Sequence, residues 1–208
     1  MKHLHRDDLF SWTLFDEARN VDFHGTYWSA HGGVLVDPLP LSAHDRAHID
    51  LLGGVGTIVV TNSDHARSAV ELSKSFGAVL CGPKAERDTL GWADARWIGD
   101  GDEVVPGLMA LVLNGSKTPG ELALVLDETT LITGDLVRGQ HGGRLNRLPD
   151  AKLADVAAAE LSIRRLSELP EIDAVIVGDG WPVFSGGRGA LQKLAAGILR
   201  HADTSSSG

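Results

Sequence analysis

The sequence contains a single cysteine, Cys81, among its 208 residues. One cysteine can form neither an intrachain disulfide nor a cysteine-based zinc cluster, and a lone cysteine fits a reducing compartment. We interpret Cys81 as a small buried hydrophobic residue.

Long apolar runs are absent as well. No window approaches the roughly 20 consecutive apolar residues that span a bilayer, and residues 1–8 have no apolar segment behind them. We therefore expect a cytoplasmic protein without membrane contact. The serine-rich residues 203–208 have too little apolar surface to offset the entropy of ordering, so we expect a disordered tail after a single domain of residues 1–202.

Positive charge is scarce. The chain has 19 Lys and Arg residues against 28 Asp and Glu, a formal net charge of −9, with no long block of either sign. This balance excludes nucleic acid as an expected partner, because binding to phosphates needs a basic surface. The sequence also lacks nucleotide-binding glycine motifs and the serine motif G-x-S-x-G. The partner that we expect is therefore a small-molecule ligand or substrate. A homodimer is also possible, but only because dimers are common among proteins in general.

What the sequence does contain is an alternation of strand and helix patterns. Strands are expected at residues 10–15, 22–28, 33–37, 57–61, 78–81, 108–113, 121–127, 130–133 and 174–177. Helices are expected at residues 43–52, 69–76, 83–88 and 191–199, with a further long helix that Asp150 caps and Pro170 stops. The glycine-rich residues 139–143 are interpreted as a mobile loop. Two halves, each a sheet with helices on one face, must stack sheet on sheet, which predicts a four-layer αββα sandwich of the α/β (α+β) class.

Polar groups of such a sandwich are reachable in the loops that leave the carboxyl ends of strands. Four segments qualify: residues 61–67 (T-N-S-D-H-A-R), 116–121 (S-K-T-P-G-E), 133–135 (T-G-D) and 178–181 (G-D-G-W). Their order and spacing resemble the landmarks of the metallo-β-lactamase superfamily, which are T-H-x-H-x-D-H, G-H-T-P-G, T-G-D and P-G-H-G. The resemblance implies the αββα fold and hydrolysis of an ester, amide, thioester or phosphodiester by a metal-bound hydroxide.

The ligand positions of that family hold mostly other residues in this chain. Asn62, Asp64 and Arg67 stand at the three histidines of the first landmark, Ala66 at its aspartate, Lys117 at the histidine of the turn and Asp179 at the last histidine. Asp135, which the resemblance makes the metal-bridging carboxylate, is retained.

One interpretation keeps a metal ion. Asp64, Asp135 and Asp179 offer oxygen only, which suits Mg, Mn or Ca better than Zn, and His65 could add one nitrogen. On this interpretation the three aspartates are the candidate metal ligands for one divalent ion (Mn, Mg or Zn), and Asp64, His65 and Asp135 are the candidate catalytic residues.

The other interpretation has no metal. Carboxylates gathered in one pocket repel by roughly 4 kcal/mol per pair at 4 Å and an effective dielectric constant of 20. Arg67 and Lys117 would place cations in the space of the metal and donate hydrogen bonds to the aspartates. Asn62, Arg67, Lys117 and Trp181 then become candidate contacts for a small ligand.

Structural roles stay open beside both interpretations. The whole polar network could simply hold loops together, and Trp181 could be an aromatic lid over the core. His65 is expected to bond the backbone, and Asp37 is expected to orient neighbouring loops. The functional alternatives are a hydrolase with altered metal ligands, a non-catalytic anion-binding module, and assembly through a sheet edge or helix face. Sensitivity to a chelator separates the first from the second.

Overall fold

The computed structural model describes the backbone of residues 1–205 and the side chains through residue 198. The predicted tail covers residues 203–208. The last helix continues through residues 203–205, and residues 206–208 lie outside the described part. Among residues 1–205, none of the helices combines the length and hydropathy that a membrane span needs.

The first sheet has seven strands in chain order. They are β1 (Lys2–His3), β2 (Leu9–Asp16), β3 (Val21–Trp28), β4 (Val34–Val36), β5 (Thr57–Val59), β6 (Val79–Pro83) and β7 (Arg96–Ile98). Pairing is antiparallel from β1 to β4 and parallel from β4 to β7. The parallel part brings the carboxyl ends of β4 and β5 to one edge of the sheet.

The second sheet has the order β14-β11-β10-β9-β8. Its strands are β8 (Glu103–Val105), β9 (Leu108–Val112), β10 (Leu122–Leu126), β11 (Thr130–Thr133) and β14 (Ala174–Val177). The meander β8–β11 is antiparallel, whereas β11 and β14 run parallel, so their carboxyl ends also coincide. A separate hairpin joins β12 (Val137–His141) to β13 (Arg144–Arg147).

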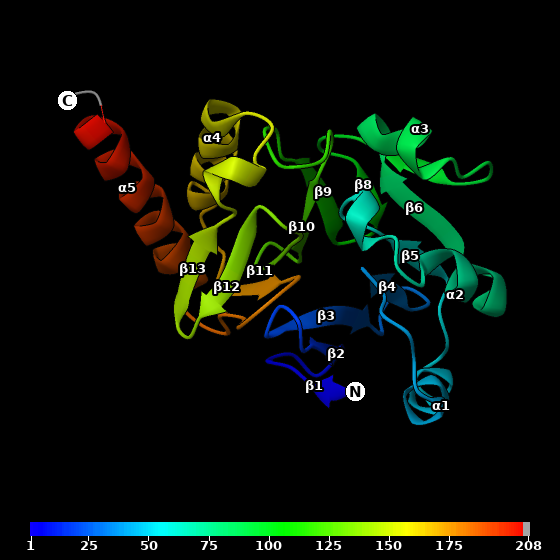
Figure 1. Cartoon of the computed structure of the whole chain (residues 1–208). Coiled ribbons are helices and arrows are strands. Elements are labelled where there is room, and N and C mark those ends of the chain that lie inside the picture. Colours follow the sequence, from blue (N-terminus) through cyan, green and yellow to red (C-terminus); the bar gives the residue numbers. More distant parts are fainter. Residues whose placement is uncertain (206–208) are drawn as a thin grey trace.

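Helices cover the outer face of each sheet, as Figure 1 shows. The helices of the first half are α1 (Ala43–Leu51), α2 (Ala69–Phe76) and α3 (Arg87–Leu90), and those of the second half are α4 (Val156–Ser167) and α5 (Gly187–Ser205). Short 3₁₀ turns are η1 (Ser63–His65), η2 (Lys84–Glu86) and η3 (Asp150–Lys152). Ser42 caps α1 by accepting a hydrogen bond from the backbone NH of Asp45, and Gly77 ends α2 in the left-handed conformation.

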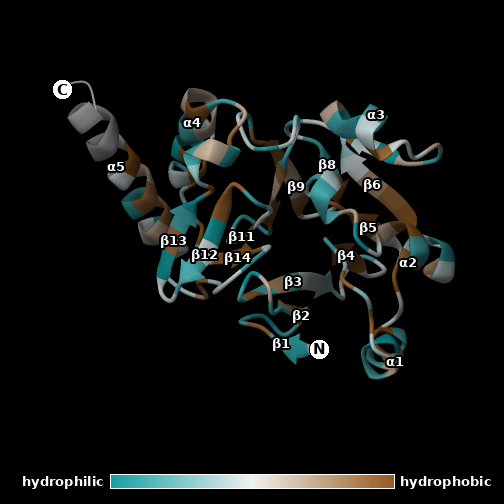
Figure 2. Ribbon diagram, in the orientation of Figure 1, coloured by the Kyte–Doolittle hydropathy of each residue, from teal (hydrophilic) through white to brown (hydrophobic). Residues whose placement is uncertain are grey.

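Three buried apolar clusters fill the spaces between the layers, as the hydrophobic colouring of the strands in Figure 2 reflects. The cluster around Leu9, Val59, Leu124 and Ile176 joins the two sheets. A second cluster packs α4 and α5 on the second sheet, and a third packs α1 and α2 on the first. The predicted four-layer αββα sandwich is therefore confirmed.

Several predicted details were wrong. Asp150 does not cap the long helix: it begins η3, Leu153 is extended, and Asp155 caps α4 by accepting a hydrogen bond from the backbone NH of Ala158. Both aspartates precede helical patterns, but η3 ends at the extended Leu153, which packs half-buried against the second apolar cluster, before α4 begins. Residues 139–143 belong to the β12–β13 hairpin, with Gly143 at φ +71° in its turn. Pro83 is both the last residue of β6 and the N-cap of η2, which runs into α3, so the predicted short helix is present and ends at Leu90 instead of Asp88.

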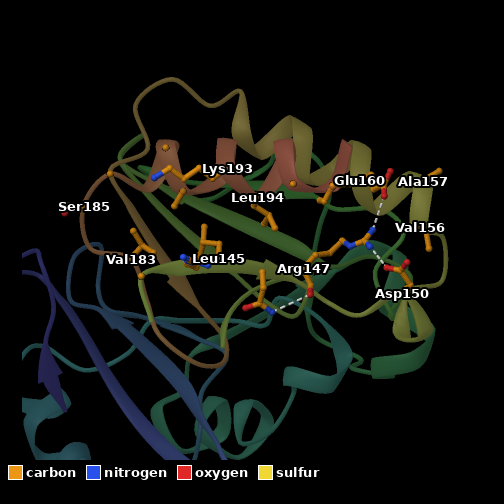
Figure 3. A pocket seen from close by; sticks show the side chains of 18 residues that line it. Leu145, Arg147, Asp150, Val156, Ala157, Glu160, Val183, Ser185, Lys193 and Leu194 are labelled. Carbon is orange, nitrogen blue, oxygen red and sulfur yellow. Dashed lines mark hydrogen bonds and ion pairs between the residues drawn. The ribbon is translucent and has the colours of Figure 1, made fainter. Parts of the chain in front are cut away.

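A groove of about 1400 Å³ lies between β13, α4 and α5. In Figure 3, Arg147 extends into it and pairs with Asp150 and Glu160. These three side chains belong to the helical side of the second sheet.

Candidate functional site

Four strand ends converge at one edge of the sandwich and position the candidate residues. Asp37 follows β4, Asn62 follows β5, Asp135 follows β11 and Asp179 follows β14. The two sheets are joined there by a hydrogen bond from the backbone NH of Leu122 to the carbonyl of Thr61 at 2.7 Å, and by a bridge between Phe23 and Asp179. The parallel strand pairs thus explain why residues far apart in the sequence meet.

Asp135 is the centre of the cluster and is only 5% exposed. Its Oδ2 lies 2.9 Å from Lys117 Nζ, 3.2 Å from Asn62 Nδ2 and 3.6 Å from His65 Nε2. Burial raises the pKa of Asp135, but the neighbouring His65 and Lys117 outweigh burial and hold the pKa well below its usual range. Asp135 is therefore an ionised carboxylate whose Oδ2 already has three partners.

Lys117 bridges two aspartates, as the sequence predicted. Its Nζ lies 2.6 Å from Asp64 Oδ2 and 2.9 Å from Asp135 Oδ2. Burial lowers the pKa of Lys117, but hydrogen bonding to Asp64 and the charge of Asp135 raise it above its ordinary value. Asp64 is the exposed member, with 54% of its side chain accessible. The bridge consequently has one buried end and one end in solvent.

Arg67 does not reach the aspartates, which corrects the prediction. Its Nη1 donates to the backbone carbonyls of His24 at 3.0 Å and Asp37 at 3.1 Å, and its guanidinium lies 5.3 Å from the Phe23 ring. The physical reason is that the carboxylates of Asp37 and Asp135 already have other donors. Arg67 ties the β3 and β4 backbones together instead.

Asp179 has a partner that sequence reasoning missed. Arg138 of β12 donates to Asp179 Oδ1 from Nε at 2.9 Å, and its Nη2 donates to Oδ2. Asp179 is 2% exposed, so this two-point pair is nearly removed from water. An arginine three residues after Asp135 was the available signal, but Arg138 was given no role because only residues 139–143 were assigned, as a mobile loop.

His65 bonds carboxylates and not the backbone, contrary to expectation. Its Nδ1 lies 2.7 Å from Asp37 Oδ2, on the side opposite Asp135. Burial lowers the pKa of His65, but Asp37 and Asp135 together raise it to about 9, so the ring is an imidazolium at neutral pH. The packing is tight, because a Cβ on Gly178 would lie 2.8 Å from His65 Cε1.

Asp37 orients loops, as expected. Besides its bond to His65, it accepts from the backbone NH and the hydroxyl of Thr61, both at 2.7 Å. These bonds fix the start of the segment that carries Asn62, Asp64 and His65.

Two buried glutamates near the site were not singled out from the sequence. Glu121 accepts from the Ser116 hydroxyl at 2.5 Å and from the backbone NH of Leu136 at 2.8 Å. Burial and the charge of Asp135 raise the pKa of Glu121 to about 7. Glu86 accepts from the backbone NH groups of Ser63 and Gly120. Glu121 is the last residue of the landmark segment 116–121, whereas Glu86 lies outside all four segments and had no signal in the sequence.

Trp181 lies in the loop after Asp179, with 66% of its surface exposed. It lines a separate cavity whose lining residues include neither Asn62 nor Lys117 nor Asp135. The structure therefore does not bring Trp181 together with the other predicted ligand-binding residues in that cavity.

The donor atoms of this pocket fit a divalent metal ion poorly. Asp64 and Asp135 share the Lys117 ammonium, and both oxygens of Asp179 accept from Arg138. Within the described residues, no group of three or more His, Cys, Asp or Glu side chains is arranged to hold a metal ion. The four cations Arg67, Lys117, Arg138 and protonated His65 balance the four aspartates at positions 37, 64, 135 and 179.

Comparison with protein families agrees with this architecture. A family model described as "Metallo-beta-lactamase superfamily" matches residues 1–198. The chain belongs to the metallo-β-lactamase superfamily. A comparison with curated proteins gives no match.

Several solved structures share the fold of this superfamily member. VMB-1 is 14% identical with a TM-score of 0.73, covering 95% of each chain. A metallo-β-lactamase from Pontibacter korlensis is 18% identical with a TM-score of 0.71, covering 93% of this chain and 96% of that one. TTHA1623, solved in a di-iron-bound form, is 20% identical with a TM-score of 0.63, covering 88% of this chain and 98% of that one. Identities this low show the fold alone.

Proposed function

We propose that this superfamily member works without a metal ion in the pocket and binds a small anion, a carboxylate or a phosphate, at the pocket rim. The observation that carries the proposal is Lys117 Nζ at 2.6 Å from Asp64 and 2.9 Å from Asp135. An ammonium group between these oxygens pairs with both carboxylates and offsets one of their two negative charges, and its own charge repels a divalent cation. The metal and the lysine compete for the same oxygens.

Asp64 is the replaceable partner in this arrangement. Its side chain is 54% exposed, whereas that of Asp135 is 8% exposed. Water competes strongly with an exposed ion pair, so the Asp64–Lys117 pair is worth at most about 1 kcal/mol. An incoming anion can take the place of Asp64 beside Lys117 while Asp135 keeps the ammonium in position.

The charge of the pocket depends on pH once Asp64 has turned away. Arg138 and Asp179 neutralise each other. The other charged groups are three cations and two carboxylates, namely Arg67, His65 and Lys117 with Asp37 and Asp135. Among these five groups the excess is one positive charge. The buried carboxyl of Glu86, which accepts from the Ser63 NH, lies beside them, and Glu121, with a pKa of about 7, adds negative charge only as the pH rises. Anion binding should therefore be stronger below pH 7.

Metal content and phosphate binding test this proposal together. We expect the purified protein to hold far less than one metal ion per chain by plasma mass spectrometry, also after loading with Zn, Mn or Mg. Inorganic phosphate, followed by calorimetry at pH 6.5, should bind to the wild type. Asp64→Asn should bind it several-fold more tightly, and Lys117→Met should lose it.

Arg147→Met is the matched control, because it removes another cation that bridges two carboxylates, in the groove. It should leave phosphate binding unchanged. One stoichiometric metal ion after loading, or weaker phosphate binding by Asp64→Asn, would overturn the proposal.

A second candidate function is metal-dependent hydrolysis, favoured by Asp135 at the position of the family's bridging carboxylate. It requires Lys117 to leave Asp64 and Asp135. Hydrolysis of a chromogenic ester should then stop with chelator and with Asp135→Ala. Anion binding through Lys117 should be indifferent to chelator.

A further inference from the structure

A cavity of about 470 Å³ lies beside the β1–β3 end of the first sheet, away from the charged pocket. Its walls come from residues 1–4, from β2 and β3, and from residues 176–184. None of the charged residues at positions 64, 117 and 135 lines it. The volume is in the range of roughly 300–1,000 Å³ that is typical of small-molecule sites.

Aromatic and aliphatic side chains dominate the lining. Trp12, Trp181, Phe184, Ile176 and Leu4 all border the cavity. Two of them are unusually open to solvent: Trp181 is 66% exposed and Phe184 is 43% exposed. An exposed tryptophan and an exposed phenylalanine beside one hollow offer ring faces on which a flat molecule can stack.

The segment that presents these rings is held by backbone bonds. The NH of Gly180 donates to the Asp22 carbonyl at 2.9 Å, and Val183 exchanges two hydrogen bonds with Val175 at 2.7 and 2.9 Å. Gly180 has φ +84°, and a Cβ there would lie 2.4 Å from the Gly139 carbonyl oxygen, so the close approach requires glycine. The cavity is therefore largely preformed.

The polar groups at the cavity indicate a ligand without net charge. Lys2 and Asp22 contribute one charge of each sign, and the amino group of Met1, which also lines the cavity, is paired with Asp45. Burial lowers the pKa of His24, whose Nε2 lies 2.5 Å from the Gly180 carbonyl oxygen, so its ring is neutral. The lining thus favours neither an anion nor a cation.

We propose that this cavity binds an uncharged aromatic small molecule that stacks on Trp181 and Phe184. The concave shape and limited volume suit a small molecule better than a folded partner. The site is independent of the anion-binding pocket proposed above, because the two share no side chain.

Binding of N-phenyl-1-naphthylamine, an uncharged aromatic fluorophore, tests this proposal on the full chain. Its emission should rise with one saturable site per chain. Trp181→Ala and Phe184→Ala should each weaken binding by about 10-fold, roughly the loss of 1.4 kcal/mol of stacking. Leu161→Ala is the control, because Leu161 is an exposed apolar residue, 63% accessible, on α4 outside the cavity.

The outcomes are distinct. Equal binding by the wild type and both aromatic variants, or no saturable site, would overturn the proposal. So would a dimer seen by analytical ultracentrifugation that dissociates in Trp181→Ala, because a second copy would then be the occupant. Lys117→Met should keep the fluorophore site, so failure of the anion proposal leaves this one standing.

Discussion

The β12–β13 hairpin carries an arginine on each of its two faces, and their surroundings differ sharply. Val137 pairs with Arg147 and Arg138 pairs with Asn146, so the two arginines point to opposite faces. Arg138 reaches Asp179, whose side chain is 3% exposed. Arg147 reaches Asp150 and Glu160, whose side chains are 65% and 29% exposed.

This contrast indicates that the cost of breaking an ion pair depends on how deeply the pair is buried, and not on its geometry alone. Water can solvate Asp150 and Glu160 if Arg147 is lost, but it cannot reach Asp179 in the same way. In the pocket, a buried charged group is stable only while its partner is present. At the groove, a charged group that loses its partner is solvated by water. Removal of single groups should therefore affect the two faces very differently.

The largest expected effect is the loss of Arg138. Arg138→Met leaves Asp179 buried without a cation and should lower the free energy of unfolding by about 3–5 kcal/mol. Arg147→Met should lower it by about 1 kcal/mol or less. Urea unfolding of both variants followed by circular dichroism checks the difference. Equal losses would show that burial does not separate the two faces.

If Arg138→Met does not fold, the double variant Arg138→Met/Asp179→Asn provides the second measurement. It removes the unpaired charge and should recover much of the stability. No recovery would mean that the arginine acts through packing and not through the pair.

A pH dependence specific to the pocket comes next in size. The pKa of His65 is raised from 6.5 to about 9 because Asp37 and Asp135 outweigh the effect of burial. A folded-state pKa above the unfolded value stabilises the fold fully below pH 6.5, and this contribution is lost as the pH rises through 9. Between pH 7.5 and 10 the contribution of His65 to the free energy of unfolding should fall by about 2 kcal/mol, in addition to the loss from the buried Cys81, whose pKa is raised to about 11.

The window starts at pH 7.5 because Glu121, with a pKa of about 7, is by then mostly ionised. Urea unfolding across this range measures the effect, and His65→Gln should remove the His65 contribution while the contribution of Cys81 remains. The residues described as lining the groove include no histidine, so the groove offers no such contribution. If the free energy of unfolding of His65→Gln fell with pH as steeply as that of the wild type, His65 would not be the source of this pH dependence.

The sequence predicted the architecture well because its signals are local. Ser42 before α1, Gly77 after α2 and the buried apolar strand of residues 174–177 each determine an element through nearby residues. The β12–β13 hairpin was not predicted because its residues are mostly polar and glycine-rich and have low strand propensity. Pairing between the two strands stabilises them instead.

The site was predicted in part for the same reason. Position in the landmark segments was enough to place Lys117 beside Asp64 and Asp135. Arg67 and Arg138 could not be assigned in this way, because each arginine selects its partner after the fold has satisfied other groups. Only the structure shows that Asp135 Oδ2 already has three partners. It also shows that Asp179 pairs with Arg138 and not with Lys117.

The smallest expected effect concerns the helix that borders the groove. Asp155 accepts a hydrogen bond from the backbone NH of Ala158 at 3.0 Å, whereas Asp150 pairs with Arg147 and is largely exposed. Asp155→Ala should cost about 1 kcal/mol by removing the cap of α4, and Asp155→Ser should retain most of that stability. Asp150→Ala should cost less than about 0.5 kcal/mol, since its ion pair is open to water. Thermal unfolding of the three variants orders them, and a greater loss for Asp150→Ala would mean that η3 and not Asp155 controls the start of the helix.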